Sequence, residues 1–178
     1  MRKLLNAELH RKTVDKYKES AKTPIVVVLD NVRSLNNIGS IFRTADAFLL
    51  EAIYLCGISA TPPHKDIHKT ALGAEDSVSW KYFTNCSLAV DELKQAGYEL
   101  IAVEQTVDSV SLEIFPMEAD KKYALIFGNE VKGVAQEIID GCDGCVEIPQ
   151  FGTKHSFNVS VSAGIVLWEL YRKIILGK

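Results

Sequence analysis

The stretch that decides the fold is Ile25-Val-Val-Val-Leu29, a continuous apolar run in which four of the five residues are β-branched. The dipeptide Thr23-Pro24 precedes the run and the acidic residue Asp30 follows it. A run of this length and composition is typical of a strand that is buried on both faces. Such strands occur in parallel sheets covered by helices, so the stretch predicts an α/β domain.

On both sides of this run, strand and helix patterns alternate along the chain. A helix rich in charged residues is expected over residues 3–20, before the first strand. The later elements are expected as helices at 38–50, 65–72, 88–95, 134–139 and 159–176, and as strands at 52–56, 78–83, 98–104, 123–127 and 145–148. This alternation indicates an α/β fold with a mostly parallel sheet.

The length and composition narrow the class of protein. The chain has 178 residues, 47% of them hydrophobic, which suits one domain with a sizeable core. Every apolar run is shorter than the 18 residues that a membrane-spanning helix needs, and the first residues lack the apolar core of a secretory signal. We therefore expect a cytoplasmic protein with no membrane partner.

The charge is unevenly distributed. The whole chain carries a net charge of −3, yet residues 1–24 hold seven basic and three acidic residues. The remainder is therefore acidic, with thirteen basic and twenty acidic residues. We expect residues 1–23 to form a basic helical extension and residues 24–178 to form the main domain. The basic residues Arg11, Lys12, Lys16 and Lys18 suit a polyanionic partner, although an ordinary solvated helix explains the same pattern.

The four cysteines point to reduced thiols and give little support to a metal site. Cys142 and Cys145 form a C-x-x-C pair, and Cys56 and Cys86 are far from it in sequence. Structural zinc normally takes four ligands, and a second pair at partner spacing is missing. His64 and His68 follow Pro62-Pro63 in polar surroundings, which favours a surface loop or helix start. We expect no metal.

Three loops that follow strands carry candidate functional residues, because ligands of open α/β sheets bind beyond the carboxyl ends of the strands. In the first loop, Asn37 and Gly39 stand where a helix begins, and such a helix start suits an anion. Arg43 follows one turn later and could bind a phosphate through two parallel hydrogen bonds. An exposed arginine beside a plain helix cap explains the same spacing.

The second and third loops contain glycines and small polar residues. The strand at 123–127 runs into Gly128, Asn129 and Glu130, where glycine permits close approach of a ligand. The third loop, at 148–158, leads into the last helix through Ser156 and Asn158. The three loops together predict one cleft.

Several common signatures are missing from the sequence. The chain has no G-x-G-x-x-G after its first strand, no G-x-x-x-x-G-K-[ST] and no G-x-S-x-G. A typical dinucleotide-binding oxidoreductase, a P-loop NTPase and an α/β hydrolase are therefore disfavoured.

Taken together, the three loops resemble the three motifs of the SpoU (TrmH) family of RNA ribose 2′-O-methyltransferases, in the SPOUT class. Asn37-Ile-Gly39-Ser-Ile-Phe-Arg43-Thr44-Ala45 is similar to N-x-G-x-x-x-R-T-A, and Gly128-Asn129-Glu130-x-x-Gly133 to G-N-E-x-x-G. Ile148-Pro149 with Ser156-Phe157-Asn158-Val159-Ser160-Val161 is similar to I-P…S-L-N-V-S-V, with Phe157 in place of leucine. The resemblance covers about residues 24–175 and extends to a short segment at 69–75.

The resemblance implies a fold, a cofactor and a partner. The fold is an α/β-knot whose C-terminal part forms a trefoil knot, with S-adenosyl-L-methionine bound there. The cofactor-binding residues implied are Glu104, Gln105, Phe127, Gly128, Asn129, Ile148, Ser156, Phe157 and Asn158. Family members are homodimers with the active site completed across the interface. The nearly all-round apolar start of the last helix would suit such an interface, and the core of a single chain would explain it equally.

The resemblance also gives the catalytic residues their roles. Arg43 would act as the base or steer the proton of the ribose hydroxyl toward the RNA phosphate, while Asn37 and Asn158 would position Arg43 and the ribose. Glu130 would hold this group or the cofactor side. The basic extension would supply part of the RNA-binding surface, through Arg11, Lys12, Lys16 and Lys18.

Two other functions remain open at this point. A catalytically silent knotted module for RNA binding or assembly would keep the fold, although the intact set of Asn37, Arg43, Glu130 and Asn158 argues against it. A small-molecule α/β enzyme would not explain all three motifs. Transfer RNA and ribosomal RNA are both open as substrates, with transfer RNA favoured.

Overall fold

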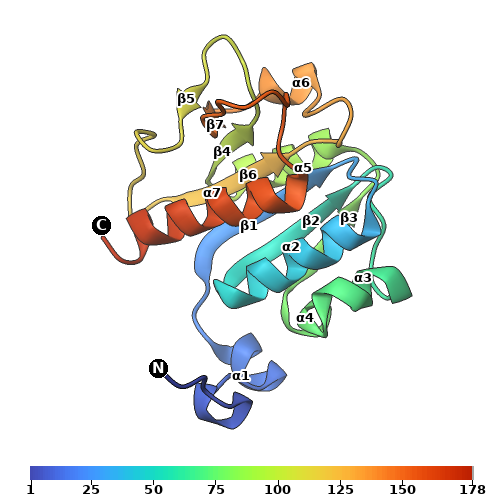
Figure 1. Ribbon diagram of the computed structural model, residues 1–178. Helices are drawn as coiled ribbons and strands as arrows, with labels where there is room; N and C mark the ends of the chain where they lie inside the picture. Colours follow the sequence, from blue (N-terminus) through green and yellow to red (C-terminus); the bar gives the residue numbers. More distant parts are fainter. Residues whose placement is uncertain (178) are drawn as a thin grey trace.

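Strand β1 (Thr23–Asp30) lies inside a seven-stranded sheet and pairs in parallel with β2 (Leu50–Cys56) on one side and β6 (Lys122–Phe127) on the other. The computed structural model describes residues 1–177. The strand order is β3-β2-β1-β6-β4-β7-β5, and each neighbouring pair is parallel (Figure 1). The other strands are β3 (Trp80–Phe83), β4 (Tyr98–Val103), β5 (Val110–Ser111) and β7 (Gly144–Glu147). The expected parallel α/β fold is confirmed.

Both faces of the sheet are buried, as the apolar run in β1 predicts. Ile25, Val27 and Leu29 belong to the core on one face, and Val26 and Val28 to the core on the other. This split follows from the period of two in a strand, where successive side chains point to opposite faces. A strand covered on both sides therefore cannot alternate between apolar and polar residues.

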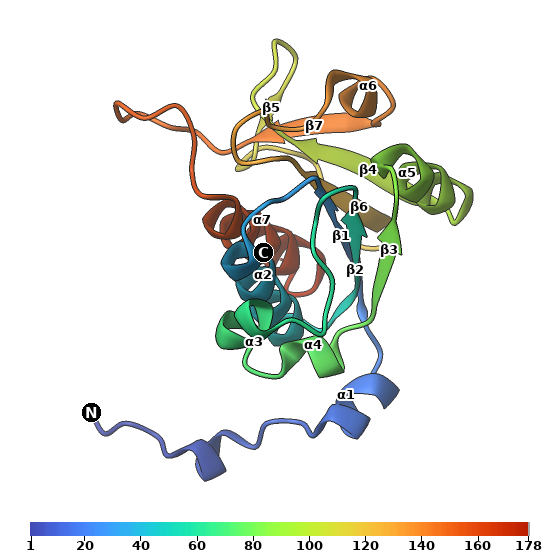
Figure 2. The ribbon, with the colours of Figure 1, turned by 90° about the vertical axis from the view of Figure 1, so that its right-hand side faces the viewer.

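The helices form the two outer layers (Figure 2). One layer packs on the face of Ile25 and consists of α2 (Leu35–Ala47), α3 (Lys65–Ala71), α4 (Ala74–Ser77) and α7 (Val159–Ile174). The other layer packs on the face of Val26 and consists of α5 (Cys86–Gln95) and α6 (Gln136–Ile139). In residues 1–177, no helix has both the length and the apolar character needed to cross a bilayer.

Most predicted elements are found, with corrected ends. The predicted helix at 65–72 is followed by a second short helix, α4, because Leu72 and Gly73 both take positive φ angles, of 54° and 92°. The strand expected from residue 78 begins at Trp80. Strand β5 was not predicted, because its two residues, Val110 and Ser111, are too few to form a recognisable pattern.

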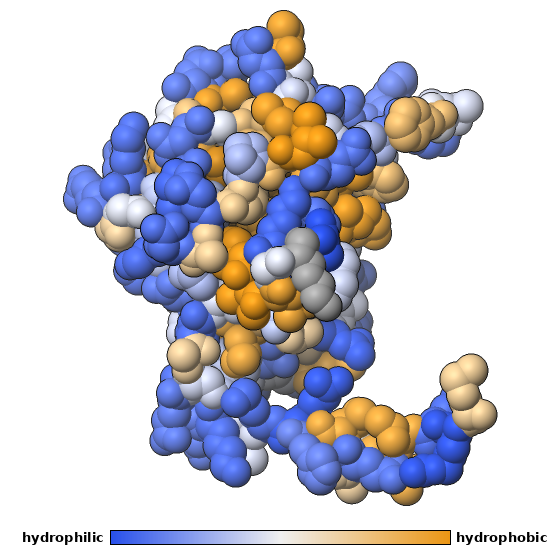
Figure 3. Space-filling model, turned by 90° about the vertical axis from the view of Figure 1, so that its left-hand side faces the viewer, coloured by the Kyte–Doolittle hydropathy of each residue, from blue (hydrophilic) through white to orange (hydrophobic). Residues whose placement is uncertain are grey.

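The single N-terminal helix predicted over residues 3–20 is wrong. A 3-10 turn, η1 (Asn6–Leu9), ends at His10 in the left-handed region, and α1 (Val14–Glu19) starts again behind Thr13, whose hydroxyl accepts a hydrogen bond from the N–H of Lys16. Only Tyr17 of α1 is buried. The preceding residues extend away from the body in Figure 2, and their apolar side chains are exposed at the bottom of Figure 3. A short helix is stable when its apolar stripe packs against another surface. Within the N-terminal segment, only α1 packs against the rest of the domain.

Candidate functional site

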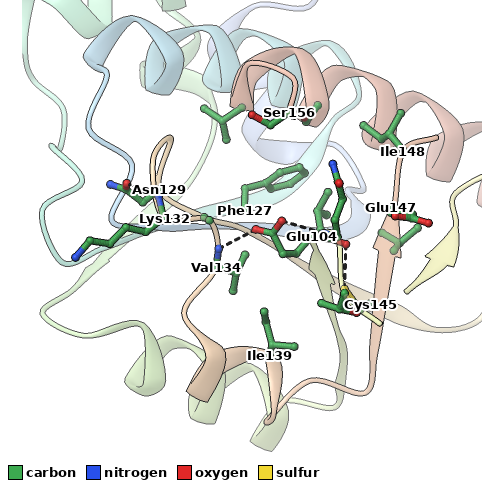
Figure 4. A pocket seen from close by; sticks show the side chains of 18 of the residues that line it. Glu104, Phe127, Asn129, Lys132, Val134, Ile139, Cys145, Glu147, Ile148 and Ser156 are labelled. Atoms are coloured by element: carbon green, nitrogen blue, oxygen red, sulfur yellow. Dashed lines mark hydrogen bonds between the residues drawn. The ribbon is translucent and has the colours of Figure 1, made fainter. Parts of the chain in front are cut away.

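A cavity of about 1380 Å³ opens at the carboxyl ends of β4, β6 and β7. All nine residues that the resemblance implied for the cofactor line it: Glu104, Gln105, Phe127, Gly128, Asn129, Ile148, Ser156, Phe157 and Asn158. They come from three separate loops, which meet because parallel strands end at the same edge of the sheet. Figure 4 shows Phe127, Ile148 and Ser156 on different walls of this cavity.

Glu104 fixes the shape of the cavity from its centre (Figure 4). Its carboxylate accepts hydrogen bonds from the N–H of Gln105 at 2.9 Å and from the N–H of Val134 at 3.1 Å. Its main-chain carbonyl accepts a bond from the thiol of Cys145 at 3.3 Å. Glu104 therefore links the loop after β4 to the loop after β6 and to β7.

The loop after β6 doubles back on itself. The main chains of Asn129 and Gly133 exchange two hydrogen bonds, of 3.0 and 2.8 Å. A Cβ atom on Gly128 would come within 2.0 Å of the carbonyl carbon of Gly133 and 2.1 Å of the nitrogen of Val134. Only glycine fits at Gly128, so the loop can turn sharply at the cavity wall.

Asn37, Glu130 and Asn158, one from each motif, form a single hydrogen-bonded chain. Nδ2 of Asn158 donates to Oδ1 of Asn37 at 3.1 Å, and Nδ2 of Asn37 donates to Oε1 of Glu130 at 3.1 Å. Asn158 also caps α7, because its side chain accepts a bond from the N–H of Ser160 at 2.9 Å. The start of α7 is thereby tied to the first turn of α2.

Glu130 occupies the anion site that the sequence predicts at the start of α2. Its two carboxylate oxygens accept bonds from the N–H groups of Arg33 and Ser34, both at 2.9 Å. Burial by itself would raise the pKa of Glu130, and the hydrogen bonds from these two N–H groups and from Asn37 outweigh it, so the pKa is lowered. Asn37 itself lies one turn inside α2, because Ser34 is the residue that caps this helix.

Arg43 lies in a different cavity from the nine cofactor candidates. It is exposed on α2 and lines a groove of about 640 Å³, together with Lys69 and Thr70 of α3, Gly164 of α7, and Ser40, Thr44, Ala47 and Phe48 of its own helix segment. Arg43 follows Asn37 by six residues, which is about 9 Å along a helix. The structure thus joins Asn37, Glu130 and Asn158 directly and sets Arg43 apart.

The predicted RNA-binding residues Arg11, Lys12, Lys16 and Lys18 lie on the exposed N-terminal segment. Arg11 and Lys12 are in the link between η1 and α1, and Lys16 and Lys18 are on α1. They are in neither of the two cavities described above.

Sequence reasoning missed two polar residues at the end of β1. Asp30 is 3% exposed, and its carboxylate accepts bonds from Nδ2 of Asn31 at 2.7 Å and from the N–H of Ala135 at 3.4 Å. Asn31 has a φ of 56°, and its carbonyl accepts a bond from Nδ2 of Asn129 at 2.7 Å. These residues connect the first loop to the second. Their position directly after the buried strand is the sequence signal that could have identified them.

The C-x-x-C pair, Cys142 and Cys145, lies on the wall of the large cavity. Burial raises the pKa of Cys142 to about 12 and also raises that of Cys145, so both are protonated thiols at neutral pH. Within residues 1–177, no three side chains of the metal-binding types converge on one point.

The family model described as SpoU rRNA methylase matches residues 24–168. This chain belongs to the SpoU rRNA methylase family. It is 31% identical over 160 residues to a TrmH family tRNA/rRNA methyltransferase of Staphylococcus epidermidis, a match that covers 90% of this chain and 63% of that protein. It is 32% identical to the 23S rRNA (guanosine-2'-O-)-methyltransferase RlmB of Neisseria meningitidis, over 88% of this chain and 61% of that one.

Solved structures of the SpoU family have the same fold. The TrmH/SpoU tRNA modifying enzyme of A. aeolicus aligns with a TM-score of 0.80 and 28% identity, over 92% of this chain and 82% of that one. The AdoMet-bound rRNA methyltransferase of Sinorhizobium meliloti aligns with a TM-score of 0.77 and 27% identity, over 90% and 59%. The family resemblance and the α/β fold class are confirmed, and the trefoil knot stays a prediction. The chain spans about three fifths of the length of the curated relatives that it matches.

Proposed function

We propose that this chain transfers a methyl group from S-adenosyl-L-methionine to a ribose 2′-hydroxyl of RNA. The observation that carries the proposal is the hydrogen-bonded chain of Asn158, Asn37 and Glu130, which unites the three family motifs beside one large cavity. The relatives named for RNA 2′-O-methylation and the AdoMet-bound neighbour support the same activity.

The large cavity has the chemistry that S-adenosyl-L-methionine requires. Phe127, Val134, Ile139 and Ile148 provide an apolar surface for an adenine ring. Carboxylates such as Glu104 and Glu147 also line it, and they suit the hydroxyls and positive charge of the cofactor. When bound, the cofactor supplies a methyl group activated by its sulfonium. The chain's own loops hold it in place and exclude water from the reacting groups.

On the RNA side, the chain must position the ribose and accept a proton. A ribose hydroxyl is a weak nucleophile at neutral pH, so it has to lose its proton as it attacks. Arg43 binds the neighbouring phosphate through its guanidinium and steers this proton toward the phosphate oxygens. Asn37 and Asn158 hold the helix starts that flank the ribose. Positioning of two bound reactants supplies most of the acceleration.

The active unit in this proposal is a homodimer. Arg43 and the large cavity are separate within one chain, so the partner's cavity can complete the site around Arg43. The outer side of α7 exposes Val161, Trp168 and Ile175, which are seven residues apart and therefore form one apolar stripe. Figure 3 shows apolar surface on the side of the molecule where α7 ends. Such a stripe suits burial against a second copy.

The dimer has a direct test. Sedimentation equilibrium of the wild type should give twice the chain mass of 19.7 kDa. Replacing Trp168 with Glu should shift the mass toward that of one chain and reduce methyl transfer. A wild type that sediments as a monomer and methylates RNA at full rate would contradict the shared site.

The remaining parts of the proposal concern RNA binding and location. Residues 1–23 act as a basic extension that contacts RNA outside the active site, and residues 24–178 form the methyltransferase domain, of which Lys178 lies outside the described residues. The protein acts in the cytoplasm, where its RNA substrates are found. The four cysteines are all free, which suits this reducing compartment.

The experiment that tests the function is transfer of labelled methyl from S-adenosyl-L-methionine to unmodified transfer RNA and ribosomal RNA fractions, followed by alkaline hydrolysis. A 2′-O-methyl group blocks attack on the adjacent phosphodiester, so ribose methylation appears as label in alkali-resistant dinucleotides. The expected result is such label with the wild type and its loss with Arg43→Ala. The fraction that becomes labelled, transfer RNA or ribosomal RNA, identifies the substrate class.

A negative result also has a defined meaning. If calorimetry shows cofactor binding and neither RNA fraction is labelled, the proposed activity is wrong for this chain alone, and the result favours a silent RNA-binding module or an enzyme that needs a partner. If Arg43→Ala retains full transfer, the ribose is methylated without Arg43.

A further inference from the structure

A third cavity, of about 610 Å³, lies at the opposite end of the sheet from β4 and β7, beside the edge strand β3. It is lined by residues of the loop before α3, of α3, of α4 and of β3: Pro62, Pro63, His64, Lys65, His68, Glu75, Asp76 and Trp80. We propose that this cavity binds an unpaired base of the substrate RNA, stacked on Trp80. The inference rests on the proposed function and extends it to a nucleotide that flanks the methylated one.

Trp80 offers the stacking surface. It is the first residue of β3, and 37% of it is exposed although it is one of only two tryptophans in the chain. Single exposed aromatics are common, so exposure alone carries no argument. Here, however, the indole forms the wall of a cavity whose other apolar wall is the pair Pro62-Pro63. A flat aromatic surface with a polar rim is how proteins hold unstacked RNA bases.

The two histidines of the rim are each held by a hydrogen bond at Nδ1. Nδ1 of His64 accepts a hydrogen bond from the N–H of Asp66 at 3.1 Å, so its Nε2 carries a proton and can donate. Nδ1 of His68 lies 2.5 Å from Oε1 of Glu75, a carboxylate that only accepts, so Nδ1 is the donor. Both Nε2 atoms are left for a nucleobase edge.

Glu75 keeps the His68 side of the rim in place. Its side chain is only 8% exposed, and Oε2 accepts the N–H of Gly73 at 3.0 Å. Burial would raise the pKa of Glu75, and hydrogen bonds, including that from His68, outweigh it and lower the pKa. The carboxylate is therefore charged at neutral pH and orients the imidazole.

Helix α3 connects this cavity to Arg43. Lys65 and His68 line the Trp80 cavity, while Lys69 and Thr70 line the groove that contains Arg43. Lys65 and Lys69 are one turn apart, which is about 6 Å along the helix. An RNA strand whose phosphate is bound at Arg43 can thus follow the cationic side chains of α3 and place a neighbouring base over Trp80. This continuity favours RNA as the occupant.

The test compares Trp80→Ala and Trp80→Phe with Tyr82→Ala as the matched control. Tyr82 lies on the same strand, is 47% exposed and is outside the cavity. Methyl transfer is measured on the RNA fraction that the wild type labels. We expect Trp80→Ala to raise the KM for RNA roughly tenfold, with kcat and cofactor affinity changed less than about twofold. Trp80→Phe, which keeps a ring, should remain within about threefold of the wild type, as should Tyr82→Ala.

A binding measurement makes the test independent of turnover. Because Trp80 and Trp168 are the only tryptophans, Trp168→Phe leaves Trp80 as the sole indole. Titration with the same RNA should quench tryptophan fluorescence in Trp168→Phe, where any change in emission comes from Trp80. Unchanged KM in Trp80→Ala, or RNA binding without quenching in Trp168→Phe, would overturn the inference while leaving the methyltransferase proposal standing. A wild type that neither labels nor binds RNA would overturn both.

Discussion

Asn158 and Asn37 are 121 positions apart in the chain, and Nδ2 of Asn158 lies 3.1 Å from Oδ1 of Asn37. The same Asn158 side chain accepts the N–H of Ser160 and so caps α7. One amide therefore has two functions, since its oxygen stabilises a helix and its nitrogen holds the residue that binds Glu130. The two functions can be separated by substitution.

Asn158→Asp should keep the cap and lose the bond to Asn37, whereas Asn158→Ala should lose both. We expect Asn158→Ala to lower the free energy of unfolding by about 1 kcal/mol, because an uncapped helix leaves N–H groups unpaired. Asn158→Asp should unfold close to the wild type. Both should lose methyl transfer to a similar degree. Urea denaturation and the methyl-transfer assay measure the two effects, and an active Asn158→Asp enzyme would show that the bond to Asn37 is dispensable.

Glu130 should make stability depend on pH in the acid range. Its folded-state pKa is lower than the ordinary value of 4.5, so its contribution is present above that value and is lost as the pH falls through the lower folded pKa. Glu130→Gln should therefore flatten the acid limb of a stability profile measured by urea unfolding between pH 7 and 3. At neutral pH we expect Glu130→Gln to lower the free energy of unfolding by about 1 kcal/mol. The loss is small because the carboxylate is exposed. Glu137→Gln, on the exposed side of α6, is the control and should leave the profile unchanged.

Gly128→Ala should damage the cofactor cavity. The added Cβ would meet the main chain of Gly133 and Val134 at about 2 Å, so the loop must move. We expect a loss of about 1–3 kcal/mol in stability and a strong loss of cofactor binding by calorimetry. Gly152→Ala is the control, because a Cβ there meets nothing within 4 Å. Equal cofactor affinity in the two variants would mean that the loop after β6 does not hold the cofactor.

Arg43→Lys should separate the charge of Arg43 from its shape. Lysine keeps the positive charge and loses the planar fork that binds a phosphate through two bonds. We expect kcat to fall on the order of 100-fold, because the phosphate that receives the proton loses its two-bond contact with the guanidinium. Single-turnover methyl transfer is the measurement. Wild-type kcat in Arg43→Lys would reduce the role of this residue to simple charge attraction.

Replacing Arg11, Lys12, Lys16 and Lys18 with Glu should weaken RNA binding and flatten its salt dependence. Each phosphate contact that is lost reduces the number of counterions released when RNA binds. The slope of log K against log salt should therefore shrink by up to about 3. Filter binding of the substrate RNA at several salt concentrations gives the slope. Cofactor affinity should stay constant, which shows that the variant is folded. An unchanged slope would place the RNA contacts of the enzyme elsewhere.

Much of the fold could be predicted because its signals are local. The β-branched run of β1 predicts a strand buried on both faces, and Asn158 is recognisable as a helix cap from its position before an apolar helix. The sequence predicts that three loops form one cleft, and the second and third loops line one cavity, whereas Arg43 of the first loop lines a separate groove. In each case the deciding interaction involves residues close in sequence or the common edge of a parallel sheet.

The N-terminal segment shows where local reasoning fails. Residues 3–20 favour a helix by composition. The helix is interrupted at His10, because only α1 packs against the rest of the domain. Leu5 and Leu9 stay exposed, while Tyr17 is buried with its hydroxyl directed at the carbonyls of Ala45 and Leu50. Helix formation in a short segment depends on tertiary packing, which composition does not describe.

The sequence by itself determined the α/β class and most of the order of the elements, and its resemblance to the SpoU family predicted Asn37, Arg43, Glu130 and Asn158 as one functional set. Only the tertiary structure decided that Asn37, Glu130 and Asn158 are hydrogen-bonded in one chain, that Glu130 fills the anion site of α2, and that Arg43 lines a groove separate from the large cavity. The physical reason is distance along the chain. Turns, caps and strand faces follow from neighbouring residues, whereas contacts between residues about a hundred positions apart depend on which strands lie side by side and on how the helices pack against them.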